Sequence, residues 1–329
     1  MAEGSVTYIL GQPHSFVDYL LAPLREESGY VVRVHRRRRT LGATLLRFVR
    51  SLLPGSHPGL WSRTILGADY VEFLSNIRPE DKLIFWAVGN KKDIRIIKED
   101  VAARHVTSML WDPLRQVCHR SRRKMRHYPE IMKRIGVRVC TFDPEDARNY
   151  GLDYVGQTYR FPDETDARIQ HVGGEVFFIG VDKRRAPKLN EIAAELENEG
   201  IGYRFKLLFD KHSRHGQFPR LDACEITTPI PYSEVLNLTR GADCLLDILQ
   251  PGQTGLTWRV LEAVFFGKKL ITDNLNVKNE PFYRPENIYI IDDPAQPWPD
   301  IRTFLAAPNV PVPDRIIKTY DIRHWIKRL

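Results

Sequence analysis

Short apolar runs alternate with amphipathic stretches along the whole chain, and this pattern predicts strands separated by helices. In the first half we expect strands at Val6–Leu10, Tyr30–His35, Lys82–Val88, His105–Trp111 and Val137–Phe142. In the second half we expect them at Glu175–Gly180, Tyr203–Phe209, Glu225–Thr228, Cys244–Leu249, Lys269–Thr272 and Asn287–Ile291. Strands that alternate with helices favour parallel, doubly wound sheets, so the expected fold class is α/β.

A polar, weakly periodic stretch divides the alternating pattern into two runs. It extends from Tyr159 to Gly174 and is typical of a linker between domains. A chain of 329 residues also exceeds the size that one hydrophobic core usually serves. We therefore expect a first α/β domain at residues 1–160 and a second at residues 161–313. Residues 314–329 are expected to form a C-terminal helix that packs back on the first domain.

The most informative stretch runs from Cys244 to Thr272 and is typical of strand, loop, helix and strand. The turn lies at Gln250–Thr254, and we expect the helix from Gly255 to Phe266. A helix N-terminus presents unpaired amides and a positive dipole end, which suits a phosphate group. Further donors would come from the side chains of Gln253, Thr254 and Thr257.

Helical spacing places Gly255, Arg259 and Glu262 along one face of that helix. There Arg259 would neutralise a second phosphate, and Glu262 would accept hydrogen bonds from ribose hydroxyls. The alternative is structural, because Arg259 and Glu262 are also spaced for an ordinary i,i+3 ion pair. The spacing alone leaves both interpretations open.

A second cationic loop follows the strand that ends near Gly180. Lys183, Arg184 and Arg185 come directly after this strand. Ligands of open parallel sheets bind beyond the carboxyl ends of the strands, so this loop is a candidate for diphosphate binding. A solvated basic turn would explain the same residues.

The charge balance indicates an anionic partner. The formal net charge is +8 and the isoelectric point is about 9.3, with basic runs at Arg33–Arg39 and Arg115–Arg126. Nucleotides, nucleic acid, a phospholipid surface and lipid-linked phosphates all fit this charge. No recognisable nucleic-acid-binding module accompanies the runs, so we expect no nucleic-acid partner. An anionic membrane surface remains a candidate partner.

Several familiar kinds of site are missing from the sequence. It contains no G-x-G-x-x-G, no G-x-x-x-x-G-K-[ST], no G-x-S-x-G and no Asp-x-Asp. The four cysteines are scattered without a C-x-x-C pair, so we expect neither a zinc site nor a disulfide framework. The sequence contains no run of 18 apolar residues, and we expect a cytoplasmic protein, peripheral at the inner face of the membrane.

Five blocks resemble bacterial glycosyltransferases of capsule, lipopolysaccharide and O-antigen biosynthesis. Along the chain they are WDPLRQVC, CTFDPEDARNYGL, FFIGVDKRR, GLTWRVLEAVFFGKKLIT and FYRPENIYII. The resemblance extends from about Lys82 to the C-terminus, and several of the blocks occur in the order expected for these enzymes. The resemblance implies a GT-B architecture, in which two Rossmann-like domains face a cleft. It also implies sugar transfer from a nucleotide-sugar to a saccharide or lipid-linked saccharide acceptor, with no cofactor and no obligatory metal.

The resemblance assigns roles to particular residues. Glu262 matches the acidic residue that binds the donor's ribose or sugar in the family. Gly255, Thr257 and Arg259 match the family's positions at the helix start that contact the diphosphate. The donor-side loop of the family matches Gly180, Lys183 and Arg184. Where many sugar-retaining members carry a first Glu, eight residues before Glu262, this chain has Thr254, so the stereochemistry stays open.

An inverting transfer needs a general base for the acceptor hydroxyl. His14 is the first candidate because it lies in the loop after the first strand, and a capping role is its structural alternative. Asp112 is the second candidate, although as a helix N-cap before Pro113 it would also have a structural role. A two-domain nucleotide-sugar epimerase and a non-catalytic basic scaffold are the competing functions.

Overall fold

The computed structural model of the chain describes residues 5–35, 40–52, 67–162, 175–210, 213 and 216–329. The chain forms two compact units: unit 1 comprises Met1–Gly156 and Lys327–Leu329, and unit 2 comprises Gln157–Ile326. The division after Gly156 lies close to the boundary expected at residue 160. Most of the expected linker (163–174) and the basic residues 36–39 lie outside the described residues.

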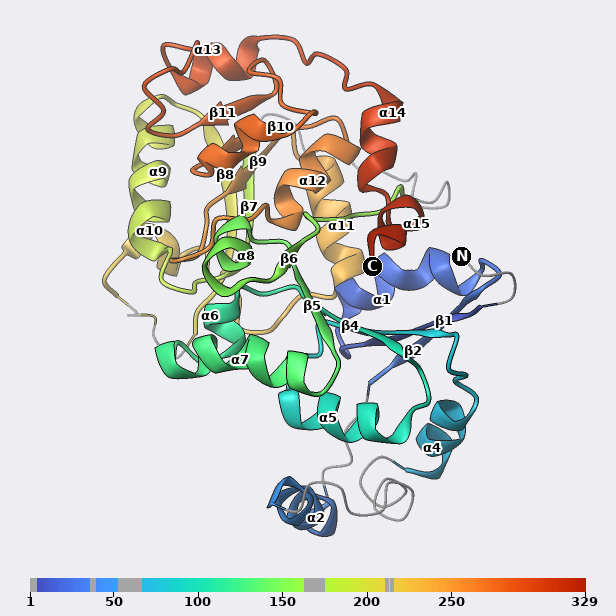
Figure 1. The fold of residues 1–329 in the computed structure, drawn as a ribbon. Coiled ribbons are helices and arrows are strands. Elements are labelled where there is room, and N and C mark those ends of the chain that lie inside the picture. The colour runs from blue at the N-terminus through green and yellow to red at the C-terminus, as the bar shows by residue number, and fades with distance from the viewer. Residues whose placement is uncertain (1–4, 36–39, 53–66, 163–174, 211–212, 214–215) are drawn as a thin grey trace. The chain divides into compact units, whose positions relative to one another are not determined.

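Unit 1 has a parallel sheet that, in the described part of the chain, has six strands in the order β2-β1-β3-β4-β5-β6 (Figure 1). The strands are β1 (Thr7–Gly11), β2 (Tyr30–Val34), β3 (Lys82–Trp86), β4 (His105–Leu110), β5 (Arg138–Thr141) and β6 (Asp153–Tyr154). The helices are α1 (Ser15–Leu21), η1 (Ala22–Arg25), α2 (Leu41–Leu52), α4 (Ala68–Ser75), α5 (Lys91–Asp100), α6 (Leu114–Val117), α7 (Arg122–Arg134) and α8 (Pro144–Tyr150). The five expected strands are confirmed to within two residues at each end.

Helices cover both faces of the unit 1 sheet. On one face Leu83 and Phe85 belong to the same buried cluster as Ile97 of α5 and Met132 of α7. Figure 1 shows α1 on the opposite face, where Phe16 is buried. Because both faces are covered, the loops after the strands are the parts of the sheet that remain for binding.

Asp146 joins two helices of unit 1. From α8, its Oδ2 accepts the amide of Leu114, the first residue of α6, at 2.6 Å. Burial raises the pKa of Asp146 from 3.8 to about 6, the bond from Leu114 opposes this rise, and the carboxylates of Asp143 and Glu145 add to it. The folded protein therefore keeps this proton over a range in which the unfolded chain has released it.

We expect Asp146 to make the free energy of unfolding fall as the pH rises from about 4 to about 6. The native state binds more protons than the unfolded state in this window, which gives the slope this sign. Asp146→Asn keeps an acceptor for Leu114 and removes the charge, so the slope should flatten in urea denaturation series. Glu72→Gln, at an exposed position of α4, is the control. A wild-type slope in Asp146→Asn would contradict the assignment.

Unit 2 has a second parallel sheet, whose five strands in the described part of the chain follow the order β11-β10-β9-β7-β8. The strands are β7 (Glu175–Val181), β8 (Gly202–Leu208), β9 (Cys244–Asp247), β10 (Lys269–Thr272) and β11 (Ile288–Ile290). The helices are α9 (Ala186–Asn198), α10 (Pro219–Asp222), α11 (Tyr232–Gly241), α12 (Trp258–Phe265), η3 (Leu275–Asn279), α13 (Ile301–Ala306), α14 (Asp314–Ile317), η4 (Lys318–Tyr320) and α15 (Ile322–Trp325). The last turn, η5 (Ile326–Arg328), begins in unit 2 and ends in unit 1.

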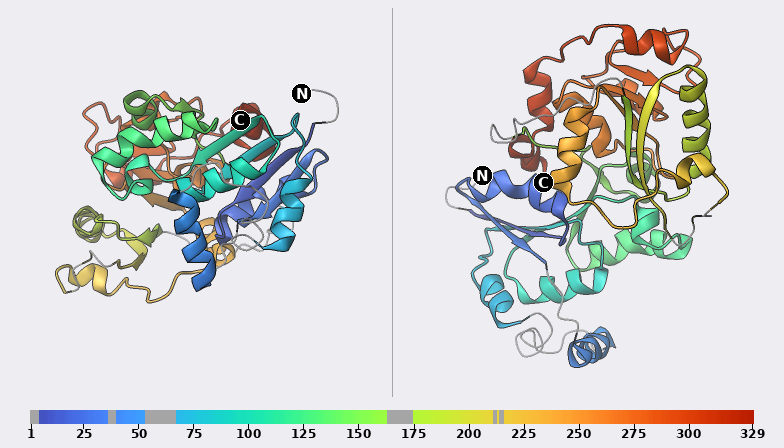
Figure 2. Two further views of the ribbon diagram at one scale, coloured as in Figure 1. Left: turned by 60° about the horizontal axis from the view of Figure 1, so that its bottom comes forward. Right: turned by 180° about the vertical axis from the view of Figure 1, so that it is seen from behind.

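The unit 2 sheet is also covered on both faces, with α9 on one side and α11 and α12 on the other (Figures 1 and 2). Leu189 of α9 shares a buried cluster with Val176 and Leu246 of the sheet. Val260 and Leu261 of α12 are also buried. Both units are therefore Rossmann-like, as expected.

Three expected elements of unit 2 differ in the structure. The strand at Glu225–Thr228 is wrong, since it is reduced to a single bridge from Leu207 to Glu225. The helix after β9 begins at Trp258 instead of Gly255. The carbonyl of Gly255 accepts side-chain amides of Gln253 and Asn274, so it is not the first acceptor of the helix.

The continuous C-terminal helix expected at 314–329 is also wrong, because the segment forms the short turns α14, η4, α15 and η5. The interruption has a clear cause. Tyr159 donates its amide to the carbonyl of Tyr320 at 2.9 Å and accepts the amide of Ile322 at 2.8 Å. These backbone groups pair with the segment after Gly156 and cannot also continue a helix. Of this segment, only Lys327–Leu329 belong to unit 1.

The helices that the structure describes are all too short or too polar to traverse a bilayer.

Candidate functional site

The turn after β7 holds two cations in an unusual backbone conformation. Lys183 and Arg184 have φ angles of 46° and 71°, a left-handed geometry that non-glycine residues rarely adopt. Asp182 supports the turn, because its Oδ1 accepts the amides of Arg185 and Ala186 at 2.9 and 2.8 Å and so caps α9. The side chain of Arg184 is exposed beyond the strand. The predicted donor-side loop is thus a tight turn at the carboxyl end of β7.

Arg185, the third of the cations expected to contact a diphosphate, is half-buried behind that turn. It donates to the carbonyl of Val181, to that of Asp182 at 3.2 Å, and to that of Ile248, just after β9, at 3.0 Å. Burial lowers its pKa to about 10, against the opposing effect of nearby carboxylates, Asp247 first. A Cβ on Gly180 would come within 2.8 Å of the guanidinium, which explains the glycine at this position.

The end of β9 is tied to the start of α12 through Asp247. This carboxylate is buried and accepts the hydroxyls of Thr257 at 2.8 Å and Thr272 at 3.0 Å. Burial raises its pKa, and the two hydroxyl bonds oppose the rise. Thr257 is the N-cap residue of α12, but its hydroxyl points to Asp247 and makes no capping bond. The first amides of the helix therefore receive no side-chain cap from Thr257.

Arg259 and Glu262 form the ion pair that was the structural alternative. Arg259 Nη1 lies 2.7 Å from Glu262 Oε2, and the guanidinium also donates to Thr239 Oγ1 at 3.0 Å and to the carbonyl of Ile179 at 3.2 Å. Glu262 accepts the hydroxyl of Tyr232 at 2.5 Å, and its side chain is 3% exposed. Both residues thus have a structural role, and their contact with a donor stays a prediction.

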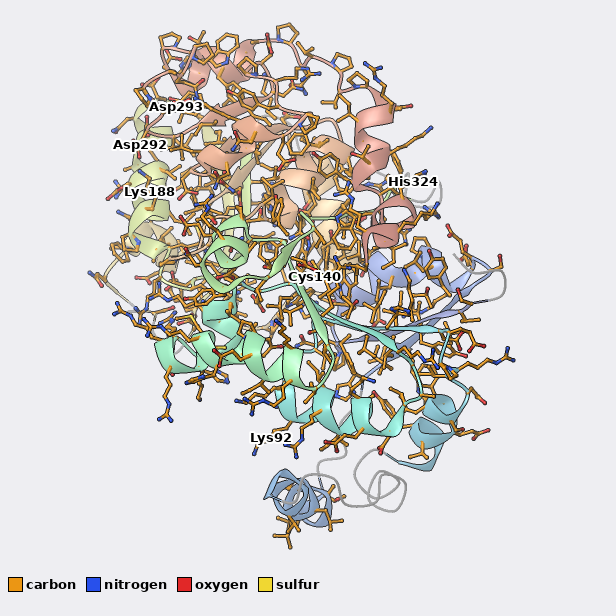
Figure 3. All side chains as sticks on the ribbon, viewed as in Figure 1. Lys92, Cys140, Lys188, Asp292, Asp293 and His324 are labelled. Atoms are coloured by element: carbon orange, nitrogen blue, oxygen red, sulfur yellow. The ribbon has the colours of Figure 1, made fainter. Side chains whose placement is uncertain are left out.

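Acidic and basic side chains border the neighbouring strands. Asp273, after β10, accepts the amide of Leu249 at 2.9 Å, and burial raises its pKa to about 6. Lys188 of α9 donates to Asp292, after β11, at 2.8 Å, and Figure 3 shows these two residues beside each other. The loops after β7, β9, β10 and β11 thus form one connected edge of the unit 2 sheet.

In unit 1 the structure brings the two candidate bases close together. The rings of His14 and Trp111 are 5.1 Å apart edge to face, and the Trp111 indole donates to Asp112 Oδ2 at 3.0 Å. His14 Nδ1 accepts the amide of Phe16 at 3.2 Å, so His14 also caps α1. With Nδ1 as acceptor, the proton of a neutral ring resides on Nε2. Base action at Nε2 therefore requires this capping contact to open.

Within the described residues, no group of three or more His, Cys, Asp or Glu side chains is arranged to hold a metal ion.

Comparison with known proteins identifies the fold. No protein-family model and no curated protein matches the sequence. The α,α-trehalose-phosphate synthase (UDP-forming) of Burkholderia vietnamiensis is similar over 99% of this chain and 98% of its own, with a TM-score of 0.58 and 12% identity. The N-terminal domain of trehalose-6-phosphate phosphatase from Candida albicans is similar over 100% of this chain and 96% of its own, with a TM-score of 0.50 and 11% identity. The chain therefore has a GT-B-type fold of two Rossmann-like domains.

Proposed function

We propose that the chain is a glycosyltransferase that moves a sugar from a nucleotide-sugar donor to a saccharide acceptor. One observation carries the proposal: the nine residues predicted to bind the donor lie at the end of β7, in two loops and in one helix, and these elements contact one another. Arg185 links the loops after β7 and β9, and Arg259 of α12 reaches the carbonyl of Ile179 on β7. The GT-B-type fold of the whole chain supports the same reaction class.

The chemistry requires stabilisation of the leaving nucleoside diphosphate. Lys183 and Arg184 supply positive charge, and the start of α12 supplies amides and a helix dipole. A charge-assisted hydrogen bond is worth roughly 1.5–3 kcal/mol, so a few such contacts suit a leaving group with about two negative charges. In this proposal the reaction proceeds without a divalent cation.

We further propose a lipid-linked acceptor in bacterial surface polysaccharide synthesis, reached from an anionic membrane. The support lies on α2, where Leu41 is 92% exposed and Leu45 is 63% exposed one helical turn later. Four arginines, at positions 36–39, precede this helix in the sequence. Exposed leucines beside basic residues suit the interface of an anionic bilayer.

The double variant Leu41→Asp/Leu45→Asp is expected to lose at least about tenfold in affinity for vesicles containing phosphatidylglycerol. Its stability should stay near that of the wild type, since both side chains are exposed. Vesicle cosedimentation measures the effect, and Val310→Asp, at a 37%-exposed position of unit 2, is the matched control. Equal cosedimentation of the double variant and the control would remove the support for membrane attachment.

A screen of UDP-, GDP-, ADP-, CMP- and dTDP-sugars separates the three functions. A glycosyltransferase should bind one of them and release its nucleotide only when an acceptor is present. An epimerase would convert the sugar without an acceptor, and a basic scaffold would bind none. Binding followed by isomerisation, or no binding at all, would contradict the proposal.

A further inference from the structure

Three successive carbonyl groups before α12 are held by side-chain amides. Asn276 donates Nδ2 to the carbonyl of Thr254 at 3.0 Å. The carbonyl of Gly255 accepts Gln253 Nε2 at 3.2 Å and Asn274 Nδ2 at 3.4 Å, and the carbonyl of Leu256 accepts Gln157 Nε2 at 3.2 Å. The segment Thr254–Leu256 is thus fixed by the adjacent Gln253 and by residues from two distant parts of unit 2.

Holding a carbonyl also sets the direction of the next amide. The peptide unit is planar and trans, so its C=O and N–H point in opposite directions. The bond to the Gly255 carbonyl therefore fixes the N–H of Leu256, and the Gln157 bond fixes the N–H of Thr257. Among the residues that the structure describes, neither N–H donates a hydrogen bond to an acceptor. This holds although Leu256 is buried, with 3% of its surface exposed. Both amides are therefore candidates for contact with an anion at the start of α12.

The anchoring side chains are themselves held in place. Gln157 is 4% exposed, and its Oε1 accepts the amide of Thr158 at 3.1 Å. Asn274 is 1% exposed, and its Oδ1 accepts the amide of Asn276 at 3.0 Å. Each of the two carboxamides therefore uses both its oxygen and its nitrogen, which fixes its orientation. The peptide units that they hold are preorganised at no further entropic cost on binding.

We propose that Gln157 and Asn274 are positioning residues that aim the amides of Thr257 and Leu256 at the diphosphate of the donor. This inference rests on the proposed function. It assigns part of diphosphate binding to backbone amides oriented from a distance. Gln157 is the first residue of unit 2, directly after Gly156, so the connection between the units also holds the loop that receives the donor.

The test compares ligand affinities of matched variants. The probe is whichever of UDP, GDP, ADP, CDP and dTDP binds the wild type best by calorimetry, together with the nucleoside of the same base measured by ligand-observed NMR. Gln157→Met and Asn274→Leu keep side-chain volume and remove the amide donor. Gln296→Met is the control, because Gln296 Nε2 donates to the carbonyl of Ile290 at 3.1 Å, in β11.

Gln157→Met is expected to weaken the nucleoside diphosphate about tenfold and the nucleoside less than about twofold. The control Gln296→Met should leave the affinities for both ligands unchanged, although it should lose about as much thermal stability as Gln157→Met. If the wild type binds a diphosphate and Gln157→Met binds it equally well, the positioning role is wrong. An equal weakening of both ligands also contradicts it. If the wild type binds none of the five, the proposed function itself fails. Asn274→Leu, with the same two expected effects, keeps the proposal testable if Gln157→Met does not fold.

Discussion

Arg185→Met should lower the free energy of unfolding by roughly 3–5 kcal/mol, whereas Arg184→Met should leave it within about 0.5 kcal/mol of the wild type. Arg185 lies among carbonyl oxygens at the ends of β7 and β9, and its charge is close to the buried carboxylates of Asp182 and Asp247. Its removal leaves these carbonyls without the guanidinium donor and takes a positive charge away from the two carboxylates. The guanidinium also lies over the ring of Phe178 at 5.0 Å, so packing is lost as well.

Arg184 is the matched control because it is the neighbouring arginine with an exposed side chain. We expect Arg184→Met to fold normally and to bind the nucleoside diphosphate about tenfold more weakly, since it removes one charge-assisted contact. Chemical denaturation and calorimetric titration of both variants measure the two effects. Comparable stability in Arg185→Met and Arg184→Met would show that the Arg185 guanidinium does not hold the site together. Unchanged binding in Arg184→Met would remove it from the donor site.

His14→Asn and Asp112→Asn are each expected to lower kcat by about 10²–10⁴-fold while changing donor affinity little. Both side chains contact Trp111, which places a proton acceptor and a carboxylate in one cluster of unit 1. A histidine near a carboxylate is a common base arrangement. The substitutions are chosen to preserve the structure. Asn at position 14 is a strong N-cap for α1, and Asn at position 112 keeps an acceptor for the Trp111 indole.

The double variant decides whether the two residues act as one unit. Groups that serve a single proton transfer give strongly non-additive effects, so the double variant should be no slower than the slower single variant by more than about threefold. Steady-state kinetics with the donor found in the screen measures this. Full activity of His14→Asn would leave His14 with its capping role alone, and multiplied losses would contradict a shared step.

The strand positions could be predicted from the sequence, and the reason is physical. A buried strand needs a short apolar run, so Lys269–Thr272 was expected at the residues where β10 lies. The connectivity and the Rossmann-like character of both units followed from the same alternation. Periodicity is a local property, and it succeeds wherever local burial decides the conformation.

The failures occurred where distant side chains or backbone segments compete for local hydrogen bonds. The start of α12 was placed too early because Gln157 and Asn274 hold carbonyls that a helix would otherwise use. The C-terminal helix is broken by the pairing of Tyr320–Ile322 with Tyr159. Sequence spacing contains no record of such long-range partners.

The candidate site was predicted in part. The sequence indicated the cations after β7. It could not show that Arg185 turns inward while Arg184 stays exposed, because the directions of these side chains depend on the left-handed backbone at Lys183 and Arg184. The ion pair between Arg259 and Glu262 was open from spacing alone and is present in the structure. No signal in the sequence marked Gln157, since its role depends on reaching Leu256 across 99 positions.

The most direct test of a donor site that needs no metal ion is a calorimetric titration of the full chain with UDP, GDP, ADP, CDP and dTDP in the presence of EDTA. We expect one of the five nucleotides to saturate a single site. Added Mg²⁺ should leave its affinity unchanged, and Arg184→Met should lower that affinity. The absence of saturable binding by all five, or binding that appears only with a divalent cation, would contradict a metal-independent donor site.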